Sequence, residues 1–249
     1  MSRTTHDIVY DDIHDEIVMG NPFGGAILTF RGGADKSEAP LRVIQGPHTK
    51  LKMPERATVD PVHNEIFEPE PDYILAFPRE ANGDAAPIRI ISGPNTGLMS
   101  ARAIATDPVH DLIIVSVDRL PADYGEGDSE GGGGRGGAFL IFKRTDNGNV
   151  KPQRIIRGIA ATNQIAVYTP KSWFAATQSG RTPEGRPDYY VGIWSINDNG
   201  KVSPRWRLGG PESGLKNLRG VALDPKHKEF VTIDTRLNAA LTFYYPEIF

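Results

Sequence analysis

Short, mainly apolar segments recur along the chain and are separated by turns rich in Asp, Asn, Gly and Pro. In the clearest unit these segments cover residues 103–106, 112–117, 138–143 and 153–157, with an Asp-Asn-Gly turn at 146–148 before the last. Short apolar runs bounded by such turns are typical of β-strands, and the last turn is typical of a β-hairpin. The pattern predicts four short strands in each unit.

Two motifs mark the repeats. Asp-x-x-His begins at Asp11, Asp60, Asp107 and Asp224, and a degenerate copy surrounds Pro170. Pro-x-Arg-x-Ile-x-Gly begins at Pro40, Pro87 and Pro152, and in drifted form at Pro204. The 47 residues from Pro40 to Pro87 give the unit length, and the repeats cover approximately 7–50, 51–97, 98–160, 161–213 and 214–249.

Four strands in a unit of 40 to 50 residues are typical of a β-propeller, which stacks small four-stranded sheets as blades. One aromatic residue recurs in each third strand, and we expect it to fill the space between blades: Phe30, Phe77, Phe142, Trp194 and Phe243. We therefore predict an all-β fold, a single β-propeller domain over residues 1–249 with five recognisable blades. Ten residues separate Phe30 from Pro40, whereas Phe243 lies six residues from Phe249, so the last blade is expected to lack its fourth strand.

Composition narrows the class of protein. The 27 Gly and 20 Pro argue against a mostly helical fold, and eight of the Gly gather between Gly125 and Gly137, where residues 123–137 are expected to form a flexible insertion. A net charge of −3 gives no electrostatic basis for binding nucleic acid. No apolar stretch is long enough to predict membrane insertion, and the first seven residues carry no signal-peptide core. The absence of cysteine excludes disulfides and thiolate sites.

The repeated histidines, His14, His63, His110 and His227, suggest metal ligands at first sight. Each follows a first strand, however, and equivalent turns of different blades lie too far apart to share one ion. We expect the Asp to cap the turn and the His to pack over it. No Walker sequence, Gly-x-Ser-x-Gly elbow or His-Glu-x-x-His motif is present. We predict no catalytic residues, no metal site and no cofactor.

Several segments resemble NHL-type repeats of bacterial β-propeller proteins, namely residues 220–231, 139–142, 147–149 and 93–98. That resemblance implies a propeller, usually with six blades where this chain supplies five. It also implies export, so a periplasmic or extracellular location is favoured. Similar propellers include lactonases and amidating lyases, which hold a metal in the central channel, as well as pure binding platforms.

Candidate binding residues come from two places. Arg56, Arg102 and Arg219 enter the first strands and could line one mouth of the channel, where arginine grips carboxylates, or could instead brace a neighbouring blade. Variable loops at 21–25, 68–73, 119–137 and 178–188 are expected on the same face, and they present Phe23, Tyr73, Tyr124 and Tyr189.

The sequence thus predicts a non-enzymatic scaffold that binds a protein partner or a small ligand through its loop-rich face. The alternative is a metal-dependent lactonase, hydrolase or lyase with an atypical channel site. A third hypothesis is self-association through the apolar C-terminal edge at 241–249, which could equally be covered by the chain's own loops.

Overall fold

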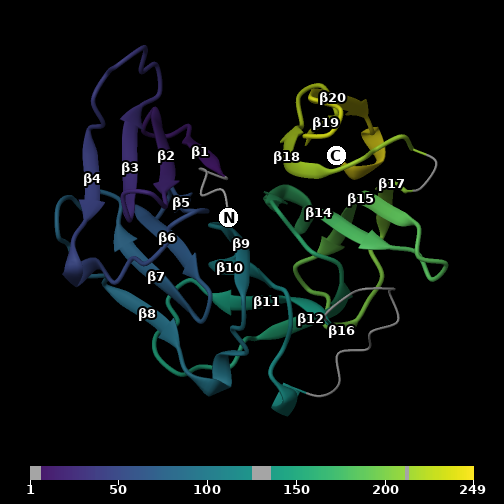
Figure 1. The fold of residues 1–249 in the computed structure, drawn as a ribbon, viewed down its shortest axis with the longest axis horizontal. Helices are drawn as coiled ribbons and strands as arrows, with labels where there is room; N and C mark the ends of the chain where they lie inside the picture. Colours follow the sequence, from purple (N-terminus) through teal and green to yellow (C-terminus); the bar gives the residue numbers. More distant parts are fainter. Residues whose placement is uncertain (1–6, 125–135, 211–212) are drawn as a thin grey trace. The chain divides into compact units, whose positions relative to one another are not determined.

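The computed structural model of the chain describes residues 7–124, 136–210 and 213–249. Over these residues the fold is all-β and consists of five small antiparallel sheets (Figure 1). Each is built from strands that follow one another in the sequence, except that the short β16 joins the third sheet instead of the fourth. The first sheet contains β1 (Ile8–Asp11), β2 (Glu16–Asn21), β3 (Ala26–Arg31) and β4 (Arg42–Gln45). The second contains β5 (Thr58–Asp60), β6 (Glu65–Glu70), β7 (Tyr73–Pro78) and β8 (Arg89–Ser92).

The third sheet contains β9 (Ala101–Asp107), β10 (Leu112–Val117), β11 (Gly137–Lys143) and β12 (Arg154–Ile159), and the short β16 (Gly200–Lys201) pairs in parallel with β12. The fourth contains β13 (Ile165–Tyr168), β14 (Trp173–Arg181), β15 (Pro187–Ser195) and β17 (Trp206–Gly209). The fifth has only three strands, β18 (Leu218–Asp224), β19 (Glu229–Asp234) and β20 (Ala239–Tyr244).

The predicted fold class is therefore confirmed: the chain is a β-propeller with five blades, and the last blade has three strands. Helical structure in the described part of the chain is limited to 3₁₀ turns, η1 (Pro47–Thr49), η2 (Pro94–Thr96), η3 (Ala122–Tyr124), η4 (Thr169–Lys171) and η5 (Pro246–Ile248). None of these is long enough to cross a membrane.

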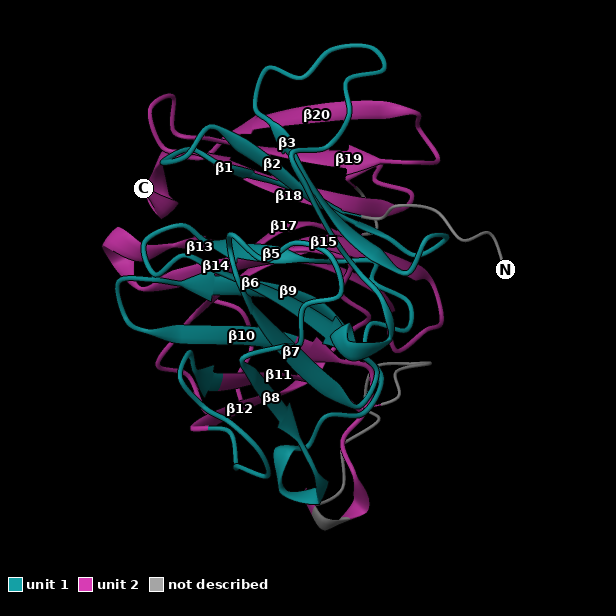
Figure 2. Cartoon of the chain, turned by 90° about the vertical axis from the view of Figure 1, so that its left-hand side faces the viewer, with its two compact units in different colours: residues 1–115, 142–152 teal, residues 116–141, 153–249 magenta. Residues whose placement is uncertain are grey.

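The chain divides into two compact units (Figure 2). Unit 1 comprises residues 1–115 and 142–152, and unit 2 comprises residues 116–141 and 153–249. The boundary runs through the third sheet, so β9 belongs to unit 1 and β12 to unit 2. The single domain over residues 1–249 stays a prediction.

The repeated Asp-x-x-His motif closes the turn after the first strand, as expected. In the first copy, Asp11 is fully buried, its Oδ1 accepts the backbone N–H of His14, and its Oδ2 lies 2.8 Å from the His14 Nδ1. The same Asp–His contact recurs at 2.9, 2.8 and 2.6 Å in the copies ending at His63, His110 and His227. Both ligand-capable groups are thus used by the turn itself.

Apolar side chains of adjacent sheets form the core of each unit. In unit 1, Val18 and Ile27 of the first sheet pack with Ile66 and Phe77 of the second. In unit 2, Phe139 contacts Phe174 and Trp194, with ring centroids 5.0 and 5.2 Å apart. Three of the five recurrent aromatics are at most 1% exposed, namely Phe77, Phe142 and Trp194, whereas Phe30 and Phe243 are half-buried.

Buried ion triads join the sheets of unit 1. The Glu16 carboxylate, at the start of β2, lies 2.5 Å from the Arg42 guanidinium of its own sheet and 2.6 Å from that of Arg79 in the next sheet. Glu65 stands at the same position of β6 and lies 2.7 Å from both Arg89 and Arg144. At the corresponding places of the fourth sheet, Trp173 packs against Trp206 with centroids 4.4 Å apart.

A second device, which we name the Asn-Gly clasp, ties the outer strand of each of the first three sheets to the following repeat. The side-chain Oδ1 of Asn82, Asn147 or Asn199 accepts the N–H of Val43, Ile90 or Ile155 at 2.9 to 3.0 Å. The glycine after the first two of these asparagines, Gly83 or Gly148, then exchanges two backbone hydrogen bonds with the same outer strand. After Asn199, Gly200 pairs with Ile156.

Two of the predicted loops are largely strand. Residues 68–70 belong to β6, so the turn to β7 is only Pro71 and Asp72, and Glu68 and Glu70 are buried. Residues 178–188 form a hairpin in which β14 continues to Arg181 and β15 begins at Pro187. The predicted flexible insertion at 123–137 lies mostly outside the described residues.

Candidate functional site

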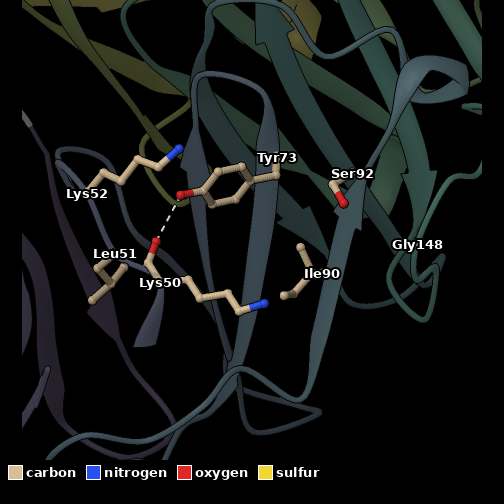
Figure 3. Close-up of a pocket in the computed structure, with 7 residues that line it drawn as sticks. All are labelled: Lys50, Leu51, Lys52, Tyr73, Ile90, Ser92 and Gly148. Carbon is tan, nitrogen blue, oxygen red and sulfur yellow. Dashed lines mark hydrogen bonds between the residues drawn. The ribbon is translucent and has the colours of Figure 1, made fainter. Parts of the chain in front are cut away.

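Unit 1 carries a groove of about 660 Å³ beside the second sheet (Figure 3). The volume is within the usual range for ligand sites, which is roughly 300 to 1,000 Å³. The groove is lined by Lys50, Leu51, Lys52, Tyr73, Ile90, Ser92 and Gly148. It therefore combines two amines with an aromatic ring and two aliphatic side chains. Tyr73 is one of the residues that the sequence predicted for binding.

The backbone of Lys50 is the most informative feature of this groove. Lys50 directly follows η1 and has the left-handed conformation, with φ of 62°. The equivalent positions of the Gly-Pro-x-Thr/Ser motif in later repeats are Gly97 and Gly214, with φ of 72° and 79°. Glycine adopts this conformation freely, whereas a residue with a Cβ is strained there by about 1 kcal/mol or more. A lysine side chain is thus kept in the groove despite its local cost.

One hydrogen bond and one cation–π contact place the lysines beside Tyr73. The Tyr73 hydroxyl donates to the Lys50 carbonyl oxygen over 2.9 Å, and the Lys52 Nζ lies 4.7 Å from the centre of the Tyr73 ring. In Figure 3 the Lys52 side chain lies to the upper left of that ring, and the Lys50 side chain runs lower in the view, toward Ile90. The Tyr73 side chain raises the pKa of Lys52, and burial raises the pKa of Tyr73. Lys52 is therefore a cation beside a neutral phenol at physiological pH.

Two buried carboxylates hold the backbone behind the groove. The Oε1 of Glu70 accepts the N–H groups of Lys52 and Met53, and the Oε1 of Glu68 accepts those of Glu55 and Arg56. The Oε2 atoms of both glutamates have no hydrogen-bond partner within the described structure. Burial, and then the charge of Glu70, raises the pKa of Glu68 well above its usual value, and burial also raises that of Glu70.

The other predicted site residues are distributed over both units. In unit 1, Phe23 is 69% exposed beyond the end of β2, Arg56 is buried and Arg102 is half-buried in β9. In unit 2, Arg219 is exposed and donates to the Asn163 Oδ1 over 3.1 Å.

The remaining two aromatic residues also lie in unit 2. Tyr124 ends η3, and Tyr189 of β15 packs against the apolar core. Of the predicted residues, only Tyr73 lines the groove, and the binding role of all of them stays a prediction.

Sequence reasoning missed Lys50 and Lys52. A signal was present, because aligning residues 46–51 with 93–98 places Lys50 opposite Gly97. A non-glycine residue at a position where sister repeats have glycine indicates a reason for keeping its side chain. In the same way, Glu68 and Glu70 were read as loop residues because Pro69 and Pro71 surround them.

The lining of the groove combines positive charge with apolar surface. Amines supply charge, Ser92 supplies a hydroxyl, and Leu51, Ile90 and the Tyr73 ring supply apolar surface. Among residues 7–124, 136–210 and 213–249, no group of three or more His, Asp or Glu is arranged to hold a metal ion.

No protein-family model matches this sequence, and no curated protein matches it. Solved structures do match in fold, each at 13% identity. Hydrazine synthase from Kuenenia stuttgartiensis superposes with a TM-score of 0.60 over 97% of this chain and 76% of its own. A chain of a nidogen/laminin complex gives 0.58 over 95% and 78%. A candidate 6-phosphogluconolactonase from Bacteroides uniformis gives 0.55 over 97% and 66%. At this identity the likeness shows the β-propeller fold alone.

Proposed function

We propose that the chain is a β-propeller binding scaffold whose unit 1 groove receives an acidic peptide segment of a partner protein. The observation that carries the proposal is Lys50, which lines the groove from a left-handed backbone position where sister repeats have glycine. Local strain of this kind is typical of binding sites.

The lining favours a peptide with alternating side chains. Lys50 and Lys52 are exposed amines that pair with carboxylates, whereas Leu51, Ile90 and the Tyr73 ring accept aliphatic groups. An extended segment that alternates acidic and apolar residues satisfies both. The lysines then confer selectivity for negative charge, and the apolar lining of the groove confers affinity.

The test is fluorescence anisotropy with a short labelled peptide of alternating Glu and Leu residues. Lys50→Gly should weaken binding about three- to fivefold, the usual value of one exposed charge pair. Lys36→Gly is the matched control, because Lys36 is also left-handed, with φ of 55°, but does not line the groove. Equal affinities of the two variants would contradict the proposal.

A peptide with Gln in place of Glu distinguishes charge recognition from apolar adhesion, and it should bind more weakly than the acidic peptide. Inorganic phosphate serves as a competitor. If phosphate alone displaces the peptide completely at millimolar concentration, the groove is a small-anion site and the peptide proposal is wrong.

The lactonase, hydrolase or lyase alternative stays a prediction. Its support is the similarity in fold to the candidate 6-phosphogluconolactonase. Elemental analysis of the gently purified protein tests it, since that alternative requires a stoichiometric metal.

A further inference from the structure

The fifth sheet of unit 2 has an open outer edge. It contains β18, β19 and β20, and among the described residues no strand pairs with the far side of β20. In the other four sheets that side is covered by β4, β8, β12 or β17. In each of these four sheets, the residue just before the outer strand donates its backbone N–H to a carbonyl oxygen of the third strand, over 2.7 to 2.8 Å. The accepting carbonyls belong to Thr29, Ala76, Ile141 and Ile193. Thr242 occupies the same register in β20 and presents its carbonyl to the open edge.

The Glu229 carboxylate lies in the fifth sheet without an arginine partner in the described structure. Glu229 begins β19 at the position that Glu16 has in β2 and Glu65 in β6. Those two carboxylates are bound by the arginines that begin the outer strands, Arg42 and Arg89. Within the described residues, the Glu229 carboxylate makes no hydrogen bond or ion pair, although its charge acts on His227. The fifth sheet thus has the glutamate of this Glu–Arg ion pair but lacks the arginine.

The neighbouring outer strand is unclasped. In the first three sheets the outer strand is held by an Asn-Gly clasp from the following repeat. In β17 the residues equivalent to Val43 and Gln45 are Arg207 and Gly209, and within the described residues their outward backbone groups have no such clasp. The clasp positions of the fifth repeat hold Ile248 and Phe249. Ile248 is 3% exposed and Phe249 packs on Tyr168 with centroids 5.3 Å apart, so neither serves β17.

One segment can satisfy all three features. The clasp asparagine lies seven residues before the first residue of its own outer strand in every complete case, from Asn82 to Arg89, Asn147 to Arg154 and Asn199 to Trp206. A chain segment with this spacing reaches from β17 to the edge of β20 in the same way. Open strand edges are templates for such pairing.

We propose that unit 2 binds, in trans, an extended partner segment that carries Asn-Gly and, seven residues after the Asn, an Arg followed by apolar residues. The segment adds a fourth strand to the fifth sheet. Its Arg lies opposite Thr242 and pairs with Glu229, and its Asn-Gly clasps Arg207 and Gly209. This interface is separate from the groove of unit 1, and the inference does not depend on the groove.

The probe is a labelled synthetic peptide with the sequence of residues 145–158, which has this spacing through Asn147, Gly148 and Arg154. We expect saturable binding to the full chain. Hydrogen exchange should slow at 239–244 and at 206–209 when the peptide is bound. Absence of binding up to millimolar peptide, or binding without this protection, would overturn the proposal.

A charge swap tests the register. Glu229→Arg should weaken binding about tenfold, because two guanidinium groups then face each other, and a peptide with Arg154→Glu should recover most of that loss on this variant. Glu247→Arg is the control, since Glu247 is exposed in η5 and has the same charge change. Both protein variants should melt as the parent does. Equal effects of the two variants would rule out the Glu229 pairing.

A peptide with Asn147→Ala and Gly148→Ala separates the clasp from the strand. It should keep the protection at 239–244 and lose that at 206–209. Unchanged protection at 206–209 would show that the Asn-Gly part of the proposal is wrong.

Discussion

At the scale of single residues, backbone strain distinguishes Lys50 from its repeats. A left-handed lysine is less stable than a glycine at the same φ. We expect Lys50→Gly to raise the free energy of unfolding by about 1 kcal/mol while it weakens acidic-peptide binding. Urea unfolding measures the first effect. If the variant is less stable than the parent, the strain argument for Lys50 fails.

Glu68 predicts an unusual pH dependence. Because its folded-state pKa is raised above the unfolded value of 4.5, the folded protein binds the proton more tightly. The stability from this group is then present below that value and is lost as the pH rises toward the folded pKa. Its Oε1 accepts two N–H groups but its Oε2 has no partner in the described structure, so ionisation leaves a buried charge that is only partly compensated.

Replacing the carboxyl by an amide removes this loss and keeps an oxygen for the N–H groups of Glu55 and Arg56. We expect Glu68→Gln to be more stable than the parent at neutral pH, by roughly 1 to 3 kcal/mol, with the difference shrinking in acid. Denaturant unfolding over a pH series measures it. An exposed control, Glu247→Gln, should show no such trend, and a parallel trend in both would contradict the assignment.

Asp234 shows that a carboxylate that accepts backbone N–H groups does not always have a raised pKa. Burial alone would raise its pKa, but N–H groups of Lys216, Asn217, Leu237 and Arg236 donate to it and hold the pKa below the usual value. Its contribution to stability is therefore lost as the pH falls. The number of donors, which sequence does not reveal, decides between the two outcomes.

This explains how much of the site could be predicted from sequence. Tyr73 was predicted because residues 68–73 were assigned to a variable loop, whereas the structure places it at the start of β7. Lys50 and Lys52 were missed because lysine is ordinary at the surface, and only the comparison with Gly97 makes Lys50 conspicuous. Glu68 and Glu70 were misread because prolines around them resemble a loop, whereas tertiary burial keeps them in β6.

At the scale of elements, buried ion triads such as Glu16 with Arg42 and Arg79 join the sheets of unit 1. The Glu16 side chain is 8% exposed and binds Arg42 and Arg79, whose side chains are 14% and 10% exposed. Although burial opposes it, these two arginines lower the pKa of Glu16. The carboxylate is therefore charged and shared between neighbouring sheets.

Removing that charge leaves the buried Arg42 and Arg79 guanidinium groups with the largely exposed Glu80 carboxylate as their remaining counter-ion in the described structure. We expect Glu16→Gln to lower the free energy of unfolding by about 3 kcal/mol. Glu229→Gln is a natural control, since Glu229 has the same place in its strand without an arginine partner in the described structure. Thermal unfolding of both variants provides the measurement. A similar loss in both would show that the triad is not the cause.

The outer strands show what the repeat motifs could and could not predict. The Pro-x-Arg motif correctly located the outer strands, because its spacing is set by the register of β3 with β4 and of its equivalents. The motif did not reveal that its Arg binds Glu16 or Glu65. That contact joins strands far apart in sequence. The arginines predicted for binding, Arg56, Arg102 and Arg219, stand at the first strands instead.

At the scale of the whole molecule, the number of blades was predictable because each repeat encodes one sheet. Fixed prolines and the Asp-x-x-His turn survive in most repeats, so the fold follows from counting them. Repeat proteins gain stability from each unit and its neighbours separately. Stability need not then be uniform along the chain, and burial indicates where it changes.

The third and fifth sheets are the extremes. Every residue of β10 is buried, as are all but the last of β11, whereas β20 alternates between half-buried and exposed positions. Amide exchange requires local opening, whose free energy rises with the apolar surface that the opening exposes. We expect hydrogen exchange to be slowest in β10 and β11 and fastest, among the second and third strands, in β19 and β20.

Hydrogen exchange read by mass spectrometry, corrected for intrinsic rates, measures this gradient in the full chain. Equal protection of β10 and β20 would show that the molecule opens only as a whole, and would remove burial as the cause. The same measurement with the peptide of residues 145–158 bound provides a second test. A fourth strand covers the edge of β20, so the gradient should flatten at 239–244 with β10 unchanged, because the added hydrogen bonds stabilise the fifth sheet and leave the third as it was.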